Sequence, residues 1–258
     1  MNTIPIHLQE NNLAEVLAGV AIAGIAEANT QRETSSQWDQ NCLCVTTPLS
    51  EQELLDAIHS FLSDVTWKQA AGDVYQGCFA SSGKIGVSPF MDSSNMGETS
   101  FFKTFSGQVT PRKICDDLQC ALKHLPLTSI ADYLAHTATG IGSWALDWRT
   151  NGHSLDRGYS SKGDNGDGTG KHDPVFVAIE TLSVTALSFF LPHAGLCAAD
   201  EQLSYHLWKQ QISWNHVGPA FLGDLPYLSR RSYLVTRRPR SYGDGASYKY
   251  FPNATPIH

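Results

Sequence analysis

The sequence predicts a single α+β domain in which a mixed sheet packs against helices and long irregular loops join the elements. Three observations support this. The first 65 residues read as strand, helix, strand, helix. Residues 65–106 are rich in Gly, Ser and aromatic residues, which predicts strands and long loops. With 41% hydrophobic and 17% charged residues, the composition is that of a globular protein. We expect one domain over 1–258, or a division into a β/α part at 1–110 and helices plus a basic ribbon at 111–258.

The N-terminal segment predicts an edge strand followed by a buried helix. Residues 3–8 alternate around Pro5 as an edge strand would, and Asn11 or Asn12 then caps a helix. This helix is nearly all apolar, and it carries the small residues Ala18, Gly19, Ala21, Ala23 and Gly24. Because small residues let another element approach the helix axis, we expect the helix to be buried between a sheet and a neighbour.

Caps and prolines predict the remaining helices. Ser50 and Glu53 have the spacing of a capping box, and proline suits the first turn of a helix because it has no N–H. The predicted elements are a strand at 41–46, a helix from Ser50 to about Ser63, a helix from Pro111 to about Leu125, a second helix at 127–138, a long apolar helix from Pro174 to Pro192, and a strand at 205–214.

Cysteine spacing and hydropathy bear on location. None of the six cysteines belongs to a C-x-x-C motif, which disfavours a zinc site. Cys42 and Cys44 share one face of the predicted strand, and Cys115 and Cys120 lie on a predicted helix. The apolar run 16–26 is too short to span a bilayer. We therefore expect a reduced, cytoplasmic protein without a membrane segment, cofactor or metal.

The segment 142–160 is the richest in potential binding residues. Asp147-Trp148-Arg149 sets a carboxylate, a ring and a planar cation side by side, and Asp156-Arg157-Gly158-Tyr159 repeats the arrangement after an Asn151-Gly152 turn. An arginine held by an aspartate beside an aromatic ring suits phosphate binding or base stacking. Arg149 and Arg157 are candidate nucleic-acid ligands, and Trp148 and Tyr159 are candidate stacking residues. The alternative is ordinary ion pairing at the edge of a core.

The C-terminal segment is basic although the chain carries a net charge of −7. From Pro226 onward there are six basic residues and one acidic residue, while the rest of the chain has 12 basic and 24 acidic residues. We expect this segment to form a two-stranded ribbon around a Gly-Asp-Gly turn and to meet an anion. Its candidate ligands are Arg230, Arg231, Arg237, Arg238, Arg240 and Lys249, with Tyr242 as a stacking residue. Protection of an exposed edge against aggregation is the alternative.

Known catalytic signatures are missing from the sequence. No metal-binding His pair and no G-x-S-x-G motif is present. Neither 83–86 nor 166–171 has the spacing of a phosphate loop, and Asp164 and Asp167 do not fit a calcium loop. The Gly- and Asp-rich stretch 160–173 is expected to be a surface loop. These observations favour a binding subunit over an enzyme.

Three patches, in order along the chain, resemble a known family. Residues 12–26 are similar to a start of the form N-P-G-x-x-x-A-x-x-G-x-x-x-x-A, with Asn12-Leu13 in place of Pro-Gly, and 103–108 to K-T-x-[AS]-G-x-Q. Residues 146–160, followed by the apolar helix after Pro174, are similar to F-D-x-R-S-x-x-x-A-L-D-x-G-F-S, with the insertion 164–173 as a departure. The patterns belong to the large-subunit-like (accessory) proteins of type I-G, formerly I-U, CRISPR-associated Cascade surveillance complexes.

The resemblance implies a non-catalytic nucleic-acid-binding subunit of an RNA-guided DNA-targeting complex with a role in antiviral defense. Its partners would be CRISPR RNA, contacted near the 5′ end, target double-stranded DNA next to the PAM, and sister Cascade backbone subunits. Lys103, Arg149 and Arg157 match basic positions of the family patterns. Two alternatives stay open: a backbone-type CRISPR RNA-binding subunit, and a metal-dependent hydrolase that uses Asp147 and Asp156 with His153 nearby.

Overall fold

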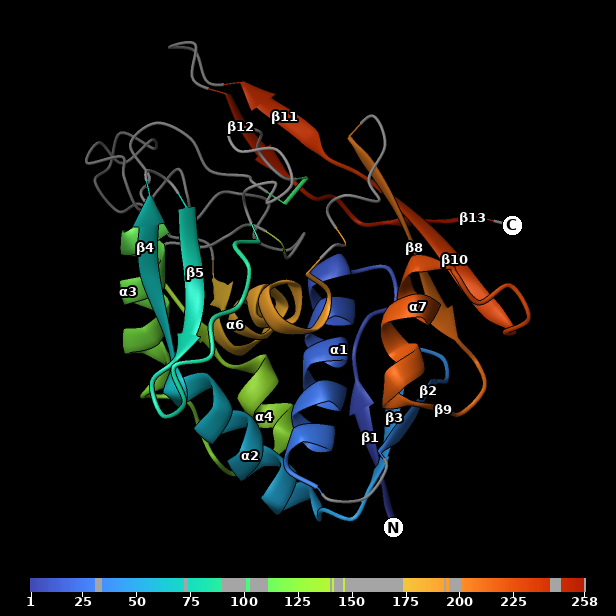
Figure 1. Ribbon diagram of the computed structural model, residues 1–258. Helices are drawn as coiled ribbons and strands as arrows, with labels where there is room; N and C mark the ends of the chain where they lie inside the picture. Colours follow the sequence, from blue (N-terminus) through green and yellow to red (C-terminus); the bar gives the residue numbers. More distant parts are fainter. Residues whose placement is uncertain are drawn as a thin grey trace.

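The computed structural model confirms the α+β class in a single domain. It describes residues 1–30, 34–71, 74–89, 101–102, 111–139, 141, 146, 174–192, 194, 201–241 and 247–257. Helices α1 (Leu13–Ala28) and α6 (Val177–Thr185) pack against each other at the centre of the molecule (Figure 1). Within the described residues, no helix has both the length and the apolar character that crossing a membrane requires.

The N-terminal sheet has four strands in the order β1-β3-β2-β9. They are β1 (Asn2–His7), β3 (Cys42–Thr47), β2 (Ser35–Trp38) and β9 (Ile212–Ser213). Alternate side chains of β1 and β3 are buried, among them Ile4, Ile6, Leu43 and Val45. The predicted edge strand is therefore confirmed, and Pro5 is tolerated there because an edge strand needs no ladder N–H at every position.

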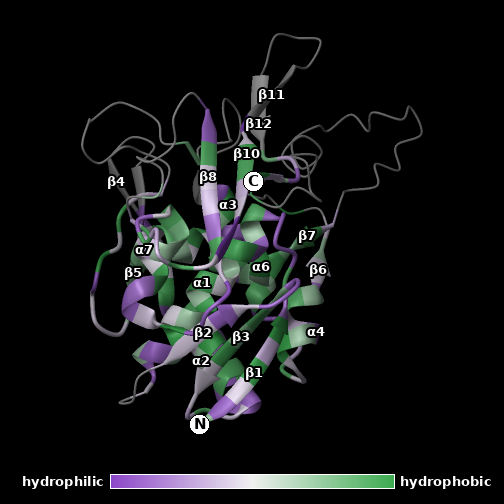
Figure 2. Cartoon of the chain, turned by 90° about the vertical axis from the view of Figure 1, so that its right-hand side faces the viewer, coloured by the Kyte–Doolittle hydropathy of each residue, from purple (hydrophilic) through white to green (hydrophobic). Residues whose placement is uncertain are grey.

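Helix α1 is buried from Leu13 to Ala26, as predicted. Asn12 caps it, because its side-chain oxygen accepts a hydrogen bond of 3.2 Å from the Ala14 N–H. A Cβ atom at Gly19 would lie 3.1 Å from the side chains of Leu8 and Leu43, so glycine lets the sheet approach the helix axis. Figure 2 shows hydrophobic residues on α1 and along β1 and β3, where these elements meet.

The predicted capping box opens α2 (Glu51–Asp64), and Ser50 and Glu53 bond each other's backbone N–H groups. The chain then forms an antiparallel hairpin. A later helix starts at Pro111, as the sequence predicted. These elements are β4 (Val65–Ala71), β5 (Val74–Phe79) and α3 (Pro111–Leu122).

Two predicted helices are shorter than the sequence indicated. Helix α4 (Ile130–Ala135), capped by Ser129, ends early because Thr137–Ala138 (β6) pairs with Val175–Phe176 (β7). The same pairing delays the start of α6 to Val177, after which the chain continues as a π-helix over Ala186–Phe190. Long-range strand pairing therefore overrides local helix propensity at both places.

A second sheet has the order β13-β10-β8, with β8 (Gln202–Trp208), β10 (Arg230–Thr236) and β13 (Thr255–Ile257). The strand predicted over 205–214 is wrong beyond Trp208, where β9, a 3₁₀ turn at Trp214–His216 and α7 (Val217–Leu222) follow. The predicted ribbon exists as the hairpin of β11 (Arg238–Ser241) and β12 (Ser247–Tyr250). A mixed sheet was expected, but every strand pair in the described part is antiparallel.

Candidate nucleic-acid interface

Six of the predicted site residues lie outside the described residues: Lys103, Trp148, Arg149, Arg157, Tyr159 and Tyr242. The same holds for the hydrolase candidates Asp147, His153 and Asp156 and for the loop at 160–173. The described part of the predicted site is therefore the basic C-terminal segment, which β10, β11 and β12 hold in place.

Arg231 takes part in a network between the two sheets. Its guanidinium pairs with the carboxylate of Glu10, which is only 5% exposed. The Tyr233 hydroxyl donates to the other carboxylate oxygen at 2.8 Å, and the Asn41 N–H donates to Glu10 at 3.1 Å. Burial and the hydrogen bond to Glu10 raise the pKa of Tyr233 to about 12. The charge of Arg231 is thus matched inside the molecule.

Arg237 is also held inside the molecule. Its side chain is buried, and its guanidinium donates to the Phe101 carbonyl at 2.8 Å and to the Glu201 carboxylate at 3.0 Å. The guanidinium carbon also lies 5.4 Å from the centroid of the Phe101 ring. These contacts tie the start of the ribbon to the body of the protein.

Arg230 lies at the opposite end of β10 and is exposed. It donates to the Gly223 carbonyl at 2.8 Å, which leaves much of its guanidinium open to solvent. The neighbouring His206 ring contacts Ser232 Oγ at 2.8 Å, and its pKa is lowered by burial first and by Arg230 second. Tyr227, with 70% of its side chain exposed, belongs to the loop that leads into β10.

The hairpin of β11 and β12 places the other predicted basic residues on one two-stranded ribbon. Its register pairs Arg238 with Tyr250 and Arg240 with Tyr248, so these four positions share one face of the ribbon, and Lys249, opposite Pro239, is on the other face. The hairpin extends away from the central helices at the end of the molecule opposite the N-terminus (Figure 1). Alternating Arg and Tyr positions are suited to phosphate contact and base stacking.

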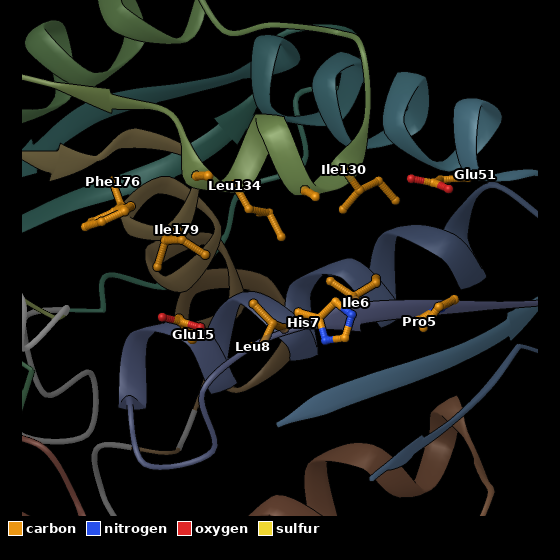
Figure 3. Close-up of a pocket in the computed structure, with 12 residues that line it drawn as sticks. Pro5, Ile6, His7, Leu8, Glu15, Glu51, Ile130, Leu134, Phe176 and Ile179 are labelled. Carbon is orange, nitrogen blue, oxygen red and sulfur yellow. The ribbon is translucent and has the colours of Figure 1, made fainter. Parts of the chain in front are cut away.

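An apolar groove that the sequence did not predict lies between β1 and α4 (Figure 3). Its cavity has a volume of about 290 Å³. The walls are formed by Ile6, Leu8, Ile130, Leu134, Phe176 and Ile179. Glu15 lies at one end and Glu51 at the other, and Glu15 already accepts hydrogen bonds from the Gln9 N–H and the Asn12 amide. The sequence signal for the open strand edge beside this groove was Pro5, because proline within a sheet is found at edge strands.

The described residues offer no cluster of metal ligands. Among them, no group of three or more His, Cys, Asp or Glu residues is placed to hold an ion. Cys42 and Cys44 share the open face of β3, as predicted, and burial together with the neighbouring Cys44 raises the pKa of Cys42 to about 11. The Cys42 thiol therefore stays protonated at neutral pH and is a weak nucleophile.

No match to this chain is found among known protein families, curated proteins or solved structures. The resemblance of its sequence motifs to the Cascade subunit family stays a prediction.

Proposed function

We propose that the protein is a non-catalytic, nucleic-acid-binding subunit of a type I CRISPR RNA-guided DNA-targeting complex. It would contact the 5′ region of the guide RNA, the target duplex next to the PAM, or both, and it would work in the cytoplasm beside sister Cascade subunits. The observation that carries the proposal is the basic hairpin of β11 and β12, which stands at one end of the molecule with Arg238 and Arg240 on one face.

The two-stranded form and the basic residues of this hairpin suit a nucleic acid. A two-stranded β-ribbon fits the major groove of a duplex, and arginine can bind phosphate oxygens or the edge of a guanine. Lys249 adds a further positive charge on the second strand. In such a complex, base pairing with the guide carries sequence specificity, and the protein reads backbone shape and a few base edges.

The distribution of charge supports a division of roles between the two ends. The first 67 residues contain nine acidic residues and one basic residue, Arg32. They form β1, α1, β2, β3, the whole of α2 and the start of β4. Strand β1 begins and α2 lies toward the end opposite the hairpin, whereas α1 lies at the centre (Figure 1). Glu10 and Glu15 are buried, but Asp39, Glu51, Glu53 and Asp56 are exposed. Because exposed carboxylates repel phosphate, nucleic acid is expected at the hairpin and not at the N-terminal end.

The test replaces Arg238 and Arg240 by alanine in the full chain, produced together with guide RNA and sister subunits. Arg237 is left intact, because its loss would break the buried contacts to Phe101 and Glu201. We expect weaker binding of guide RNA or target duplex, and a slope of log affinity against log salt that is smaller by about 2. The control replaces two exposed lysines of the body, Lys84 and Lys123, by alanine.

Two results would count against the proposal. One is a double Arg variant that binds nucleic acid like the lysine control over the whole salt titration. The other is a wild-type chain that, purified from its native cells, carries neither repeat-derived RNA nor sister subunits.

A further inference from the structure

We propose that the groove between β1 and α4 docks an extended, basic segment of a neighbouring protein subunit. The segment would pair with the free edge of β1 and bury an apolar side chain in the cavity. This inference rests on the proposed function for the identity of the partner, a sister subunit of the same complex. It adds the surface by which the protein is held on its side away from nucleic acid.

The free edge of β1 offers backbone groups for another strand. The Leu8 N–H donates to the Asn41 carbonyl, and Leu8 and Asn41 continue the β1–β3 register. Bonds to β3 recur at every second residue of an antiparallel pair, so the N–H and C=O groups of Thr3 and His7 point to the opposite, open side. None of these groups has a hydrogen-bond partner elsewhere in the described part of the chain.

Pro5 also lies on this open side, and it limits what can pair there. It supplies a carbonyl acceptor but no N–H. A partner strand can therefore accept only from Thr3 and His7, two residues to either side. Such an incomplete edge resists indiscriminate strand pairing. A partner needs additional binding energy from side chains, and the groove provides a place for it.

The cavity beside this edge suits an apolar anchor. Its volume of about 290 Å³ is at the lower end of the range for ligand pockets and matches a large side chain better than a cofactor. Ile130 and Leu134 of α4 and Ile6 of β1 line it. The exposed residues Ala131 and Ala135 of α4 also line it, and as small side chains they leave room for an incoming segment. Strand addition beside a pocket for a side chain is an established mode of peptide recognition.

Charge specifies the rest of the segment. Glu51, the first residue of α2, is exposed at one end of the groove. No lysine or arginine is among the described residues that line the groove. Helix α4 adds the exposed carboxylate of Asp132, and the first 67 residues as a whole are strongly acidic. Lysine or arginine beside the apolar anchor would complement this field, whereas an acidic segment or a nucleic acid would be repelled.

The experiment uses the full chain assembled with guide RNA and sister subunits. Ala131→Trp and Ala135→Trp fill the groove without removing a core side chain, and Ala28→Trp is the matched control, because Ala28 is an exposed helical alanine about 20 Å from Glu15 along α1. Glu51→Lys is compared in the same way with Asp56→Lys on the same helix. We expect both Trp variants of the groove and Glu51→Lys to lose at least tenfold in affinity for the sister subunits, while the controls assemble normally.

Amide hydrogen exchange gives a second readout of the same complex. The Thr3 and His7 amides should exchange rapidly in the isolated chain and slowly after assembly. In parallel, a fluorescein-labelled peptide of alternating Lys and Leu is titrated into the isolated chain. We expect it to bind the wild type at least tenfold more tightly than Ala135→Trp.

The outcomes separate this inference from the proposed function. A complex that contains guide RNA but leaves Thr3 and His7 exchanging rapidly, or that forms equally well with the groove variants, overturns the docking site and leaves the function intact. If neither RNA nor sister subunits are recovered, the proposed function fails, and the peptide titration then tests the docking site alone. Equal affinity of the peptide for the wild type and Ala135→Trp then overturns the docking site as well.

Discussion

Glu10 connects three segments that are distant in the sequence. Its carboxylate accepts from Arg231 and Tyr233 of β10 and from the Asn41 N–H before β3, while its own carbonyl accepts a 2.8 Å hydrogen bond from the Tyr205 hydroxyl of β8. It therefore ties the N-terminal sheet to the second sheet. Because the carboxylate is buried, each of its donors would lose a charged acceptor if it were neutralised.

Glu10→Gln is expected to lower the free energy of unfolding by about 2 kcal/mol, since hydrogen bonds to a charged group contribute about 1.5–3 kcal/mol. Urea denaturation at pH 7 measures this. Asp56→Asn makes the same chemical change on the exposed side of α2 and should alter stability by less than about 0.5 kcal/mol. Equal effects of the two variants would show that the carboxylate of Glu10 does not hold the sheets together.

The lowered pKa of His206 makes the free energy of unfolding depend on pH. Its pKa in the folded protein is lowered by burial and then by Arg230, which outweigh the opposite effect of Asp224. Below the ordinary histidine pKa of about 6.5, the unfolded chain binds a proton at this residue and the folded chain does not. Stability is therefore present above that value and is lost as pH falls toward the folded pKa. In urea titrations between pH 8 and 5, His206→Asn should show a smaller decline than the wild type, and parallel curves would contradict the prediction.

At the scale of the element, α2 depends on its first turn. Ser50 Oγ accepts from the Glu53 N–H at 3.3 Å, and the Glu53 carboxylate accepts from the Ser50 N–H at 2.7 Å. These Ser50 hydrogen bonds also lower the pKa of Glu53, so the box is complete at neutral pH. The cap orients a helix whose buried side chains are Leu54, Leu55, Ile58 and Leu62.

Ser50→Ala is expected to cost about 1 kcal/mol of stability, the usual contribution of an N-cap hydroxyl. Ser50→Thr should retain most of it, because threonine keeps the acceptor. Ser60→Ala, at an exposed position later in α2, is the control and should be neutral or slightly stabilising. Thermal or urea unfolding distinguishes these variants, and a Ser50→Ala protein as stable as Ser60→Ala would refute the role of the cap.

Elements were predictable where their signals are local. The Asn12 cap, the capping box at Ser50 and the apolar face of α1 all lie within one segment of chain, and the helices they predict are present. The ends of α4 and α6 were not predictable, because β6 and β7 compete there with helix formation and these strands are separated by 37 positions in the pairing of Ala138 with Val175. A strand pairing between distant segments of one chain leaves no signal in the local sequence of either strand.

At the scale of the whole molecule, opposite charges occupy opposite ends. The basic hairpin lies at one end, and the start of β1 and the acidic helix α2 lie toward the other (Figure 1). If nucleic acid binds at one end and a protein subunit at the other, the two sites share no residue. Changes at such distant sites are expected to be independent.

A combined variant tests this independence. Arg238→Ala with Arg240→Ala should weaken nucleic-acid binding alone, and Ala135→Trp should weaken subunit association alone. When all three changes are made together, each affinity should match that of the simpler variant within about 0.5 kcal/mol. Titrations with target duplex and with sister subunits measure the two affinities separately, and a clear deviation would place the two sites in one coupled surface.

The α+β class, the buried α1, the edge strand around Pro5 and the basic ribbon could be predicted, because period, caps, prolines and charge are local properties of the chain. Folding then determines which arginines are held inside the molecule. Arg231 and Arg237 read in the sequence like Arg238 and Arg240, yet folding brings them to Glu10 and Glu201. The groove between β1 and α4 likewise depends on packing between segments more than 120 residues apart, such as Ile6 and Ile130. The sequence shows which residues are charged, but long-range packing decides which groups these charges pair with.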